Sequence, residues 1–132
     1  MPAKPAKTST RATPSRPAPG LSIVVPLFNE AKGLARLHER IAEVARFLKV
    51  KRGLNLEVVY VDDGSRDDTS HIAHSLPAMP LDIQVVTLSR NFGKEAALLA
   101  GLDHARLGAV LFMDGDGQHP PSLIELLVSR WL

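Results

Sequence analysis

Short apolar segments alternate with helical patterns along this chain, and this alternation restricts the possible folds more than any other feature. The apolar segments begin near residues 21, 56, 83 and 109 and are rich in Val, Ile and Leu, as buried strands are. The intervals carry apolar residues at helical spacing or runs of strong helix formers. Strands that alternate with helices in this way are joined by right-handed crossovers in a parallel sheet. The sequence therefore predicts a doubly wound α/β half-domain of four strand–helix units.

The expected elements follow from these patterns. We expect strands over residues 21–27, 56–61, 83–88 and 109–113. We expect a first helix from about Leu34 that stops at Gly53, and a short second helix capped by Asp67 or Asp68. A third helix is expected over residues 94–106, and a last one from about Pro121. The fourth strand reads as fully buried, because its five residues are all apolar.

The first twenty residues differ from the rest of the chain. They hold five Pro and four basic residues, no acidic residue, and no large apolar residue after Met1. Such a segment cannot bury enough apolar surface to fold, so we expect a disordered, basic, Pro-rich tail over residues 1–20. With 132 residues and 45% hydrophobic composition, the chain can bury one core, which we place in a single domain over residues 21–132.

Composition also restricts the partners and the location. The net charge of +2 comes from the tail, since residues 21–132 hold 12 basic and 14 acidic residues. With 5% aromatic residues, this domain is a poor candidate for nucleic-acid binding. No Cys is present, which fits a reducing compartment, and no segment approaches the ~18 apolar residues of a transmembrane helix. We expect a cytoplasmic location, which includes the cytoplasmic face of a membrane.

Polar residues of unusual type follow each expected strand. They are Asn29 and Glu30, Asp62 and Asp63, Arg90 with Asn91 and Lys94, and Asp114 with Asp116. Because ligands bind at the carboxyl ends of the strands in open parallel sheets, these side chains are expected to converge on one site. Acids, amides and two cations together predict a site for a phosphate group and a metal ion.

The last of these turns is the candidate metal site. Only Gly115 separates Asp114 from Asp116, so both carboxylates can approach one point, where their repulsion is relieved by a cation. Carboxylate and amide oxygens are hard ligands, so these two residues, with Gln118, favour Mg²⁺ or Mn²⁺. Ordinary solvated turn carboxylates are the simpler alternative.

Two other functions place an acidic turn of this kind after a regular element. An EF-hand needs Gly at the sixth loop position, where this chain has His119, so that reading fails. An aspartyl-phosphate phosphatase also places its nucleophile in such a turn, but it needs Lys and further Asp residues downstream, and 11 residues follow Pro121. The phosphatase remains the less favoured alternative.

Two common phosphate-binding motifs are absent from the sequence, so a nucleotide would have to be bound in another way. Neither GxGxxG nor GxxxxGK occurs, so the two common Gly-rich phosphate loops are excluded. A carboxylate after the second strand can instead accept hydrogen bonds from a base or a ribose, while a metal bridges the diphosphate. Arg90 and Lys94 either add positive charge beside the diphosphate or are solvated surface residues. The helical His38, His71, His74 and His104 are expected at the surface or at its boundary.

Four segments, in order and spacing, resemble the donor half of family 2 glycosyltransferases with the GT-A fold. They are VPLFNE (25–30), VDDGSRDDT (61–69), SRNFGKEAALLAG (89–101) and MDGDGQHP (113–120). The last two are similar to the subgroup that makes dolichyl- or polyprenyl-phosphate sugars. The resemblance covers residues 21–132 and implies the Rossmann-like, nucleotide-binding half of a GT-A fold.

The resemblance also implies roles for individual residues. The nucleotide sugar would be bound by Pro26, Phe28, Asn29, Glu30, Asp62, Asp63, Arg90, Asn91 and Lys94. The metal and the diphosphate would be bound by Asp114, Asp116 and Gln118. Phe28 stands where the family often has Tyr, a change that keeps the stacking ring and removes one hydroxyl. No catalytic residue is assigned, because the family's acceptor-binding half lies beyond these motifs and the domain is expected to be truncated at its C-terminus.

The implied activity is inverting transfer of a sugar from a UDP- or GDP-linked donor to a polyprenyl or dolichyl phosphate. The acceptor oxygen of such a lipid phosphate is already anionic at neutral pH and needs less help from a general base. The alternative is a fragment that binds nucleotide sugar without catalysis.

Overall fold

The computed structural model describes residues 18–116 and residue 130. Its strands are β1 (Ala18–Leu27), β2 (Leu56–Asp62), β3 (Asp82–Thr87) and β4 (Leu107–Phe112). Its helices are α2 (Leu34–Arg52), α3 (Thr69–His74) and α4 (Lys94–His104). The expected last helix and Gln118 lie outside the described residues.

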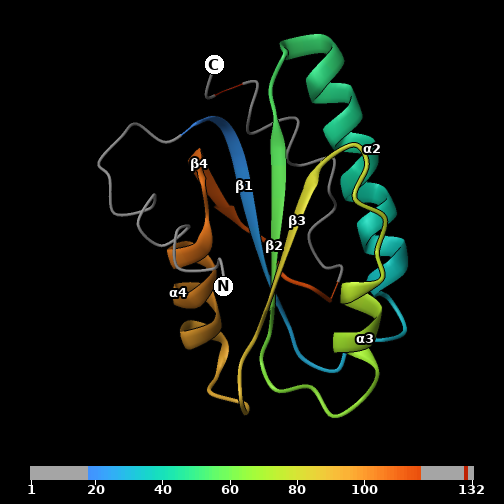
Figure 1. The fold of residues 1–132 in the computed structure, drawn as a ribbon, viewed down its shortest axis with the longest axis vertical. Coiled ribbons are helices and arrows are strands. Elements are labelled where there is room, and N and C mark those ends of the chain that lie inside the picture. Colours follow the sequence, from blue (N-terminus) through green and yellow to red (C-terminus); the bar gives the residue numbers. More distant parts are fainter. Residues whose placement is uncertain (1–17, 117–129, 131–132) are drawn as a thin grey trace, which may run out of the picture.

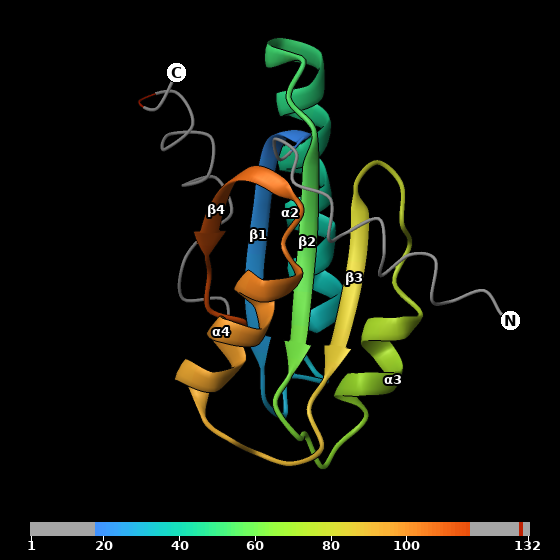
Figure 2. The same cartoon turned by 60° about the vertical axis from the view of Figure 1, so that its left-hand side comes forward.

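The described strands form one parallel sheet in the order β3-β2-β1-β4. Figure 2 shows the arrows running in one direction, so that the loops following the strands gather at one edge. In Figure 1, α2 and α3 cover one face of the sheet and α4 covers the other. The expected parallel α/β arrangement is confirmed, and the strand register, with Leu27 opposite Asp62, brings the ends of β1 and β2 level.

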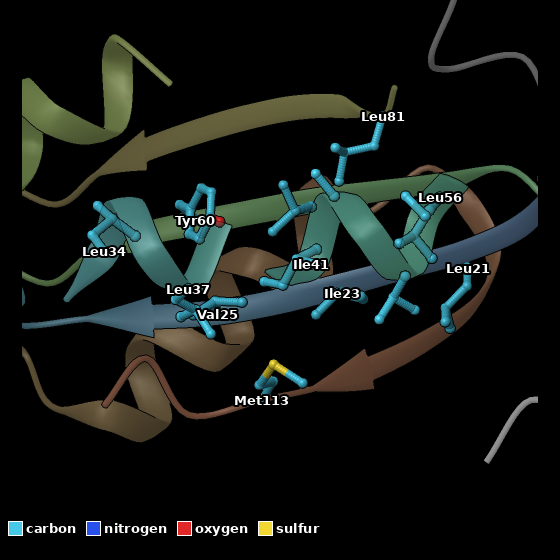
Figure 3. Packing of buried hydrophobic residues seen from close by; sticks show 14 of the residues in the cluster. Leu21, Ile23, Val25, Leu34, Leu37, Ile41, Leu56, Tyr60, Leu81 and Met113 are labelled. Carbon is cyan, nitrogen blue, oxygen red and sulfur yellow. The ribbon is translucent and has the colours of Figure 1, made fainter. Parts of the chain in front are cut away.

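The main core lies between the sheet and α2. Every third or fourth residue of α2 is buried against the alternate side chains of β1 and β2 that face it, because a helix and a strand present one face at these periods. Figure 3 shows this packing around Ile41 and Tyr60. A smaller cluster of Val24, Val59, Val61 and Ala97 lies on the α4 side. The helix ends at Arg52, and Gly53, with a left-handed φ of 63°, turns the chain as the sequence predicts. Gly53 N donates to Lys49 O at 3.0 Å and Leu54 N donates to Leu48 O at 3.3 Å.

The fourth strand differs from the expectation of full burial. It is an edge strand of the described sheet, and its side chains alternate between half-buried and exposed. Ala109 and Leu111 pack against the main core, whereas Val110 and Phe112 are 37% and 47% exposed. A run of apolar residues does not reveal whether a strand has neighbours on both sides, which is why the prediction was wrong.

The first strand begins at Ala18, inside the segment expected to be disordered. Ala18 pairs with Leu107, and the register then shifts before Leu21, whose N–H donates to Asn55 O at 3.0 Å. The irregularity accommodates Pro19, which has no N–H to give to a ladder. Residues 1–17 lie outside the described part of the chain.

A buried carboxylate joins the strands at their amino-terminal edge. Glu57 is 1% exposed and accepts hydrogen bonds from Ser22 Oγ (2.6 Å), Gln84 Nε2 (3.0 Å) and Arg106 N (2.7 Å). Burial acts to raise the pKa of Glu57, but these donors and the Arg106 guanidinium outweigh it and hold the pKa below its usual value. Glu57 thus ties β1, β2, β3 and the turn before β4 together.

His38 is a second buried polar residue, and here the expectation of a surface or boundary position was wrong. Its side chain is 1% exposed, with Nε2 at 2.8 Å from Pro77 O and Nδ1 at 2.8 Å from Tyr60 Oη. Since a carbonyl only accepts, Nε2 carries the proton and Nδ1 accepts from the tyrosine hydroxyl. Burial lowers the pKa of His38 despite the hydrogen bond to Pro77, because the charged imidazolium is poorly solvated there. A local sequence pattern could not predict this burial, because the hydrogen-bond partners of His38 lie far from it in the sequence.

Within the described residues, no helix combines the length and the apolar composition needed to cross a bilayer.

The His38 site predicts a pH-dependent stability. Because folding lowers the pKa of His38 below its ordinary value of 6.5, the unfolded chain takes up this proton first, and stability falls as the pH drops below that value. We expect urea denaturation to show a loss of up to about 1 kcal/mol between roughly pH 6.5 and pH 5.5. His38→Gln should flatten this dependence, whereas His71→Gln, at an exposed position of α3, should leave it unchanged. Parallel pH profiles for all three proteins would contradict the assignment.

Candidate functional site

A cavity of about 400 Å³ opens at the carboxyl edge of the sheet, where β1, β2 and β4 end. It lies between the loops that follow β1, β2 and β3 and the turn that follows β4. It is lined by Pro26, Leu27, Phe28, Glu30, Asp63, Asn91, Gly93, Lys94, Asp114, Gly115 and Asp116. The edge that the sequence predicts as a site is thus where the cavity forms.

Asn29 fixes the course of the loop after β1. Its φ of 55° lies in the left-handed region, which Asn tolerates better than most residues. Its N–H donates to Ser65 Oγ at 2.9 Å, and its Oδ1 accepts from Arg66 N at 2.8 Å. Asn29 is absent from the cavity wall, and its contacts join this loop to the loop after β2.

Two further hydrogen bonds join the same loops. Glu30 N donates to Thr69 Oγ1 at 2.8 Å, and Ala31 N donates to Asp67 Oδ2 at 3.2 Å. The Thr69 hydroxyl in turn donates to Asp67 Oδ1, and this bond holds the pKa of Asp67 below its usual value. Of the two expected helix caps, Asp67 accepts from Thr69 N at 2.9 Å, whereas Asp68 makes no side-chain cap hydrogen bond.

Asp63 holds the loop after β3. This residue is 4% exposed, and its N–H donates to Leu27 O at 2.9 Å. Its carboxylate accepts from Phe92 N at 2.8 Å, Gly93 N at 3.0 Å and Asn91 Nδ2 at 3.2 Å. Hydrogen bonds from backbone N–H groups to a carboxylate are among the stronger ones in proteins. One buried side chain therefore fixes three consecutive residues immediately before α4.

Gly64 allows these two loops to approach closely. It has a φ of 73°, and a Cβ at this position would lie 2.4 Å from both Arg90 C and Asn91 N. Only glycine fits both requirements. Arg90 itself is absent from the cavity wall, and its guanidinium lies over the Phe92 ring, 5.3 Å from the centroid.

The turn after β4 brings the acidic pair to the cavity. Met113 N donates to Val24 O at 3.0 Å, which extends the pairing of β1 with β4 up to Asp114. A Cβ on Gly115 would lie 2.7 Å from Pro26 O, so the turn packs directly against the end of β1. Asp114 and Asp116 consequently flank a glycine that has no room for a side chain.

Lys94 is the first residue of α4 and forms an ion pair with Asp114. The side chain of Lys94 is 59% exposed and that of Asp114 is 23% exposed. The hydrogen bond to Asp114 and its charge raise the pKa of Lys94, so the amine is a cation at neutral pH. Of the residues within 18–116 that line the cavity, Lys94 is the one cation.

The cavity carries excess negative charge. Burial raises the pKa of Glu30, and the neighbouring charges of Asp116, Asp67 and Asp114 raise it further. A divalent cation on the acidic pair would relieve this repulsion, and the oxygen donors suit Mg²⁺ or Mn²⁺. Within residues 18–116 no three or more His, Asp or Glu side chains are grouped as a metal site. The carboxylates of Asp114 and Asp116 could therefore supply part of the oxygen shell of such an ion.

The structure divides the residues predicted from the sequence into three groups. Those that line the cavity are Pro26, Phe28, Glu30, Asp63, Asn91, Lys94, Asp114 and Asp116. Those that lie beside it without lining it are Asn29, Asp62 and Arg90, and Asp62 accepts from Ser65 N at 3.1 Å. Gln118 lies outside the described residues.

Sequence reasoning missed the residues that join the loops. Ser65, Asp67 and Thr69 all lie in the VDDGSRDDT segment, whose density of short polar side chains was the available signal. Gly64 and Gly115 were visible as turn residues, but the contacts that exclude a Cβ belong to other loops.

The Asp63 contacts predict a specific effect of one substitution. Asp63→Asn keeps the size of the side chain but turns one acceptor oxygen into a donor that faces a backbone N–H. We expect a loss of about 1–3 kcal/mol in the free energy of unfolding and faster hydrogen exchange at Phe92 and Gly93. Asp68→Asn, at an exposed position without a cap hydrogen bond, is the matched control. Unchanged exchange at both amides would show that Asp63 does not hold the loop.

Comparison with curated proteins identifies relatives of known type. The chain is 44% identical to an uncharacterized glycosyltransferase of Synechocystis and 38% identical to the bactoprenol glucosyl transferase of Shigella phage SfV. Both matches cover 84% of this chain, but 34% and 35% of the relatives. The chain therefore spans about a third of the length of these proteins.

Solved structures share the arrangement of strands and helices. A structure of S. aureus TarS matches with a TM-score of 0.68 and 28% identity, covering 83% of this chain and 31% of that one. A mannosyltransferase from Pyrobaculum calidifontis in complex with GDP-Man and Mn²⁺ matches with a TM-score of 0.62 and 27% identity, covering 84% of this chain and 33% of that one. The sequence model for glycosyl transferase family 2 matches residues 22–132. The chain therefore belongs to family 2 of the glycosyltransferases, and its described residues have the parallel α/β arrangement of the GT-A fold.

Proposed function

We propose that the cavity binds a UDP- or GDP-linked sugar together with Mg²⁺ or Mn²⁺. The observation that carries this proposal is that Asp114 and Asp116 share one cavity with the cation Lys94 and with the apolar Pro26 and Phe28. Such a wall offers hard oxygen ligands, a charge for phosphate and a surface for a base. Support comes from two solved relatives, a TarS complex with UDP-GlcNAc and the mannosyltransferase complex with GDP-Man and Mn²⁺.

The lining residues have distinct roles in this proposal. The Phe28 ring is 42% exposed and provides a flat face for the base beside Pro26. Glu30, Asp63 and Asn91 offer oxygen and amide groups to the base and the ribose, and Lys94 neutralises the phosphates. Asn29, Asp62 and Arg90 are proposed to act by holding the loops, because they do not line the cavity.

The metal would be held by Asp114, Asp116 and Gln118, whose oxygen atoms are of the type that such ions prefer. A divalent ion held there would supply positive charge to the diphosphate and so stabilise its departure. Lys94 adds a second positive charge beside the same group. This arrangement makes a leaving group of the nucleoside diphosphate.

We further propose that the whole enzyme transfers the sugar, with inversion, to a polyprenyl phosphate at the cytoplasmic face of a membrane. Support comes from relatives named bactoprenol glucosyl transferases. A lipid phosphate offers an oxygen that is anionic at neutral pH, so the attack needs less help from a general base.

The test is a calorimetric titration of the 132-residue chain with UDP- and GDP-sugars, in Mn²⁺ and in chelator. We expect saturable binding in Mn²⁺ that chelator abolishes and that Asp116→Asn weakens by at least about tenfold, because the metal loses a charged ligand. Asp82→Asn, an exposed acid at the start of β3, should bind as the unmodified chain does.

Each outcome separates the alternatives. Binding followed by transfer to added polyprenyl phosphate supports the transferase, whereas binding without transfer favours a fragment that only holds the donor. No saturable binding by a chain whose circular dichroism shows it folded, or binding equal in chelator, would reject the metal-dependent site.

A further inference from the structure

The ion pair between Lys94 and Asp114 involves the carboxylate that the proposed function assigns to the metal. A divalent ion and an ammonium group cannot both lie against one carboxylate oxygen without strong repulsion at such short range. Lys94 Nζ lies against Asp114 Oδ1, so a divalent ion on that oxygen would displace the ammonium group, and an ion on Oδ2 would lie close enough to repel it.

The backbone of Lys94 is fixed, so this movement belongs to the side chain. Gly93 N donates to Asp63 Oδ2 at 3.0 Å, and Gly93 O accepts from Ala97 N at 3.1 Å as the first turn of α4 forms. The side chain of Lys94 is 59% exposed and has four rotatable bonds. It can turn about a stationary Cα without any change in the loop.

A bound nucleotide would give the displaced ammonium group a further anionic partner. Among the described residues, the cavity wall carries the acids Glu30, Asp63, Asp114 and Asp116 and one cation, Lys94. Asp63 already accepts three hydrogen bonds from its own neighbours, and Glu30 lies close enough to the acidic pair to be affected by it. A diphosphate bound in this cavity would place additional anionic oxygens near Lys94, which is part of the cavity wall.

We propose that Lys94 is an exchangeable counter-ion of the metal-binding turn. It neutralises Asp114 while the metal is absent, and it moves to the phosphates when a divalent ion occupies that carboxylate. The inference rests on the proposed function and adds to it a coupling between the two ligands. Metal displaces Lys94, the released ammonium group binds the diphosphate, and each ligand therefore strengthens the binding of the other by the same factor.

The deciding experiment measures Mn²⁺ affinity without nucleotide, from the electron paramagnetic resonance signal of free Mn²⁺. Lys94→Met removes the competing cation, so we expect it to bind Mn²⁺ about fivefold more tightly, the scale of an exposed ion pair. Lys94→Arg keeps the charge and should resemble the unmodified chain. Lys51→Met removes one charge from the far end of α2 and serves as the control for net charge. The gain should shrink in high salt, which screens exposed pairs.

A second titration measures the coupling itself. In saturating Mn²⁺, Lys94→Met should bind UDP or GDP more weakly than the unmodified chain, and the factor by which Mn²⁺ improves nucleotide binding should fall. Equal or weaker Mn²⁺ affinity in Lys94→Met would overturn the exchange while leaving the donor site intact. Absence of Mn²⁺-dependent nucleotide binding in the unmodified chain would instead reject the proposed function, and the exchange with it.

Discussion

The carboxylate of Asp63 is the interaction on which the carboxyl edge of the sheet depends. It is buried, and in the part of the chain that the structure describes its charge is balanced by the N–H groups of Phe92 and Gly93 and the Asn91 amide rather than by a cation. These backbone donors stand at the amino-terminal end of α4, where the helix dipole favours negative charge. The position of α4, and with it that of Lys94, therefore follows from a residue at the end of another strand.

Strand β2 carries a buried carboxylate near each of its ends. Glu57, near the start, is satisfied by groups from β1, β3 and the segment before β4. Asp63, directly after the end, is satisfied by the loop before α4. A buried carboxylate that loses its donors costs several times more than an ordinary hydrogen bond contributes. Both residues thus limit how far the neighbouring segments can shift.

The fold was predictable from the sequence because its signals are local. Apolar residues repeat every two positions in strands and about every 3.6 positions in helices, and a glycine marks the end of α2. Each of these signals lies within one element, and the spacing of the strands depends only on successive elements. The burial of β4 was not predictable in the same way, since it depends on the neighbours of Val110 and Phe112 in the sheet. His38 was missed for the same reason, because Tyr60 and Pro77 lie far from it in sequence.

The location of the candidate site could be predicted from the sequence, but the contacts that its individual residues make could not. Strand ends in a parallel sheet converge by topology, so Glu30, Asp63 and Asp114 could be expected at one cavity. Which polar residue faces the cavity and which holds a loop depends on hydrogen bonds between segments, as Asn29 and Asp62 show. No pattern along the chain contains that information.

The exposed flank of β4 has a consequence for how this polypeptide behaves in water. In the described residues β4 pairs only with β1, and it presents Val110 and Phe112 beside its outer row of main-chain groups. The edge of a sheet carries main-chain N–H and C=O groups that can pair with another strand, and apolar side chains beside them favour such pairing. In the part of the chain that the structure describes, this flank of β4, on the far side of β1 from Asp63, is therefore one of the two sheet edges at which a further strand can pair.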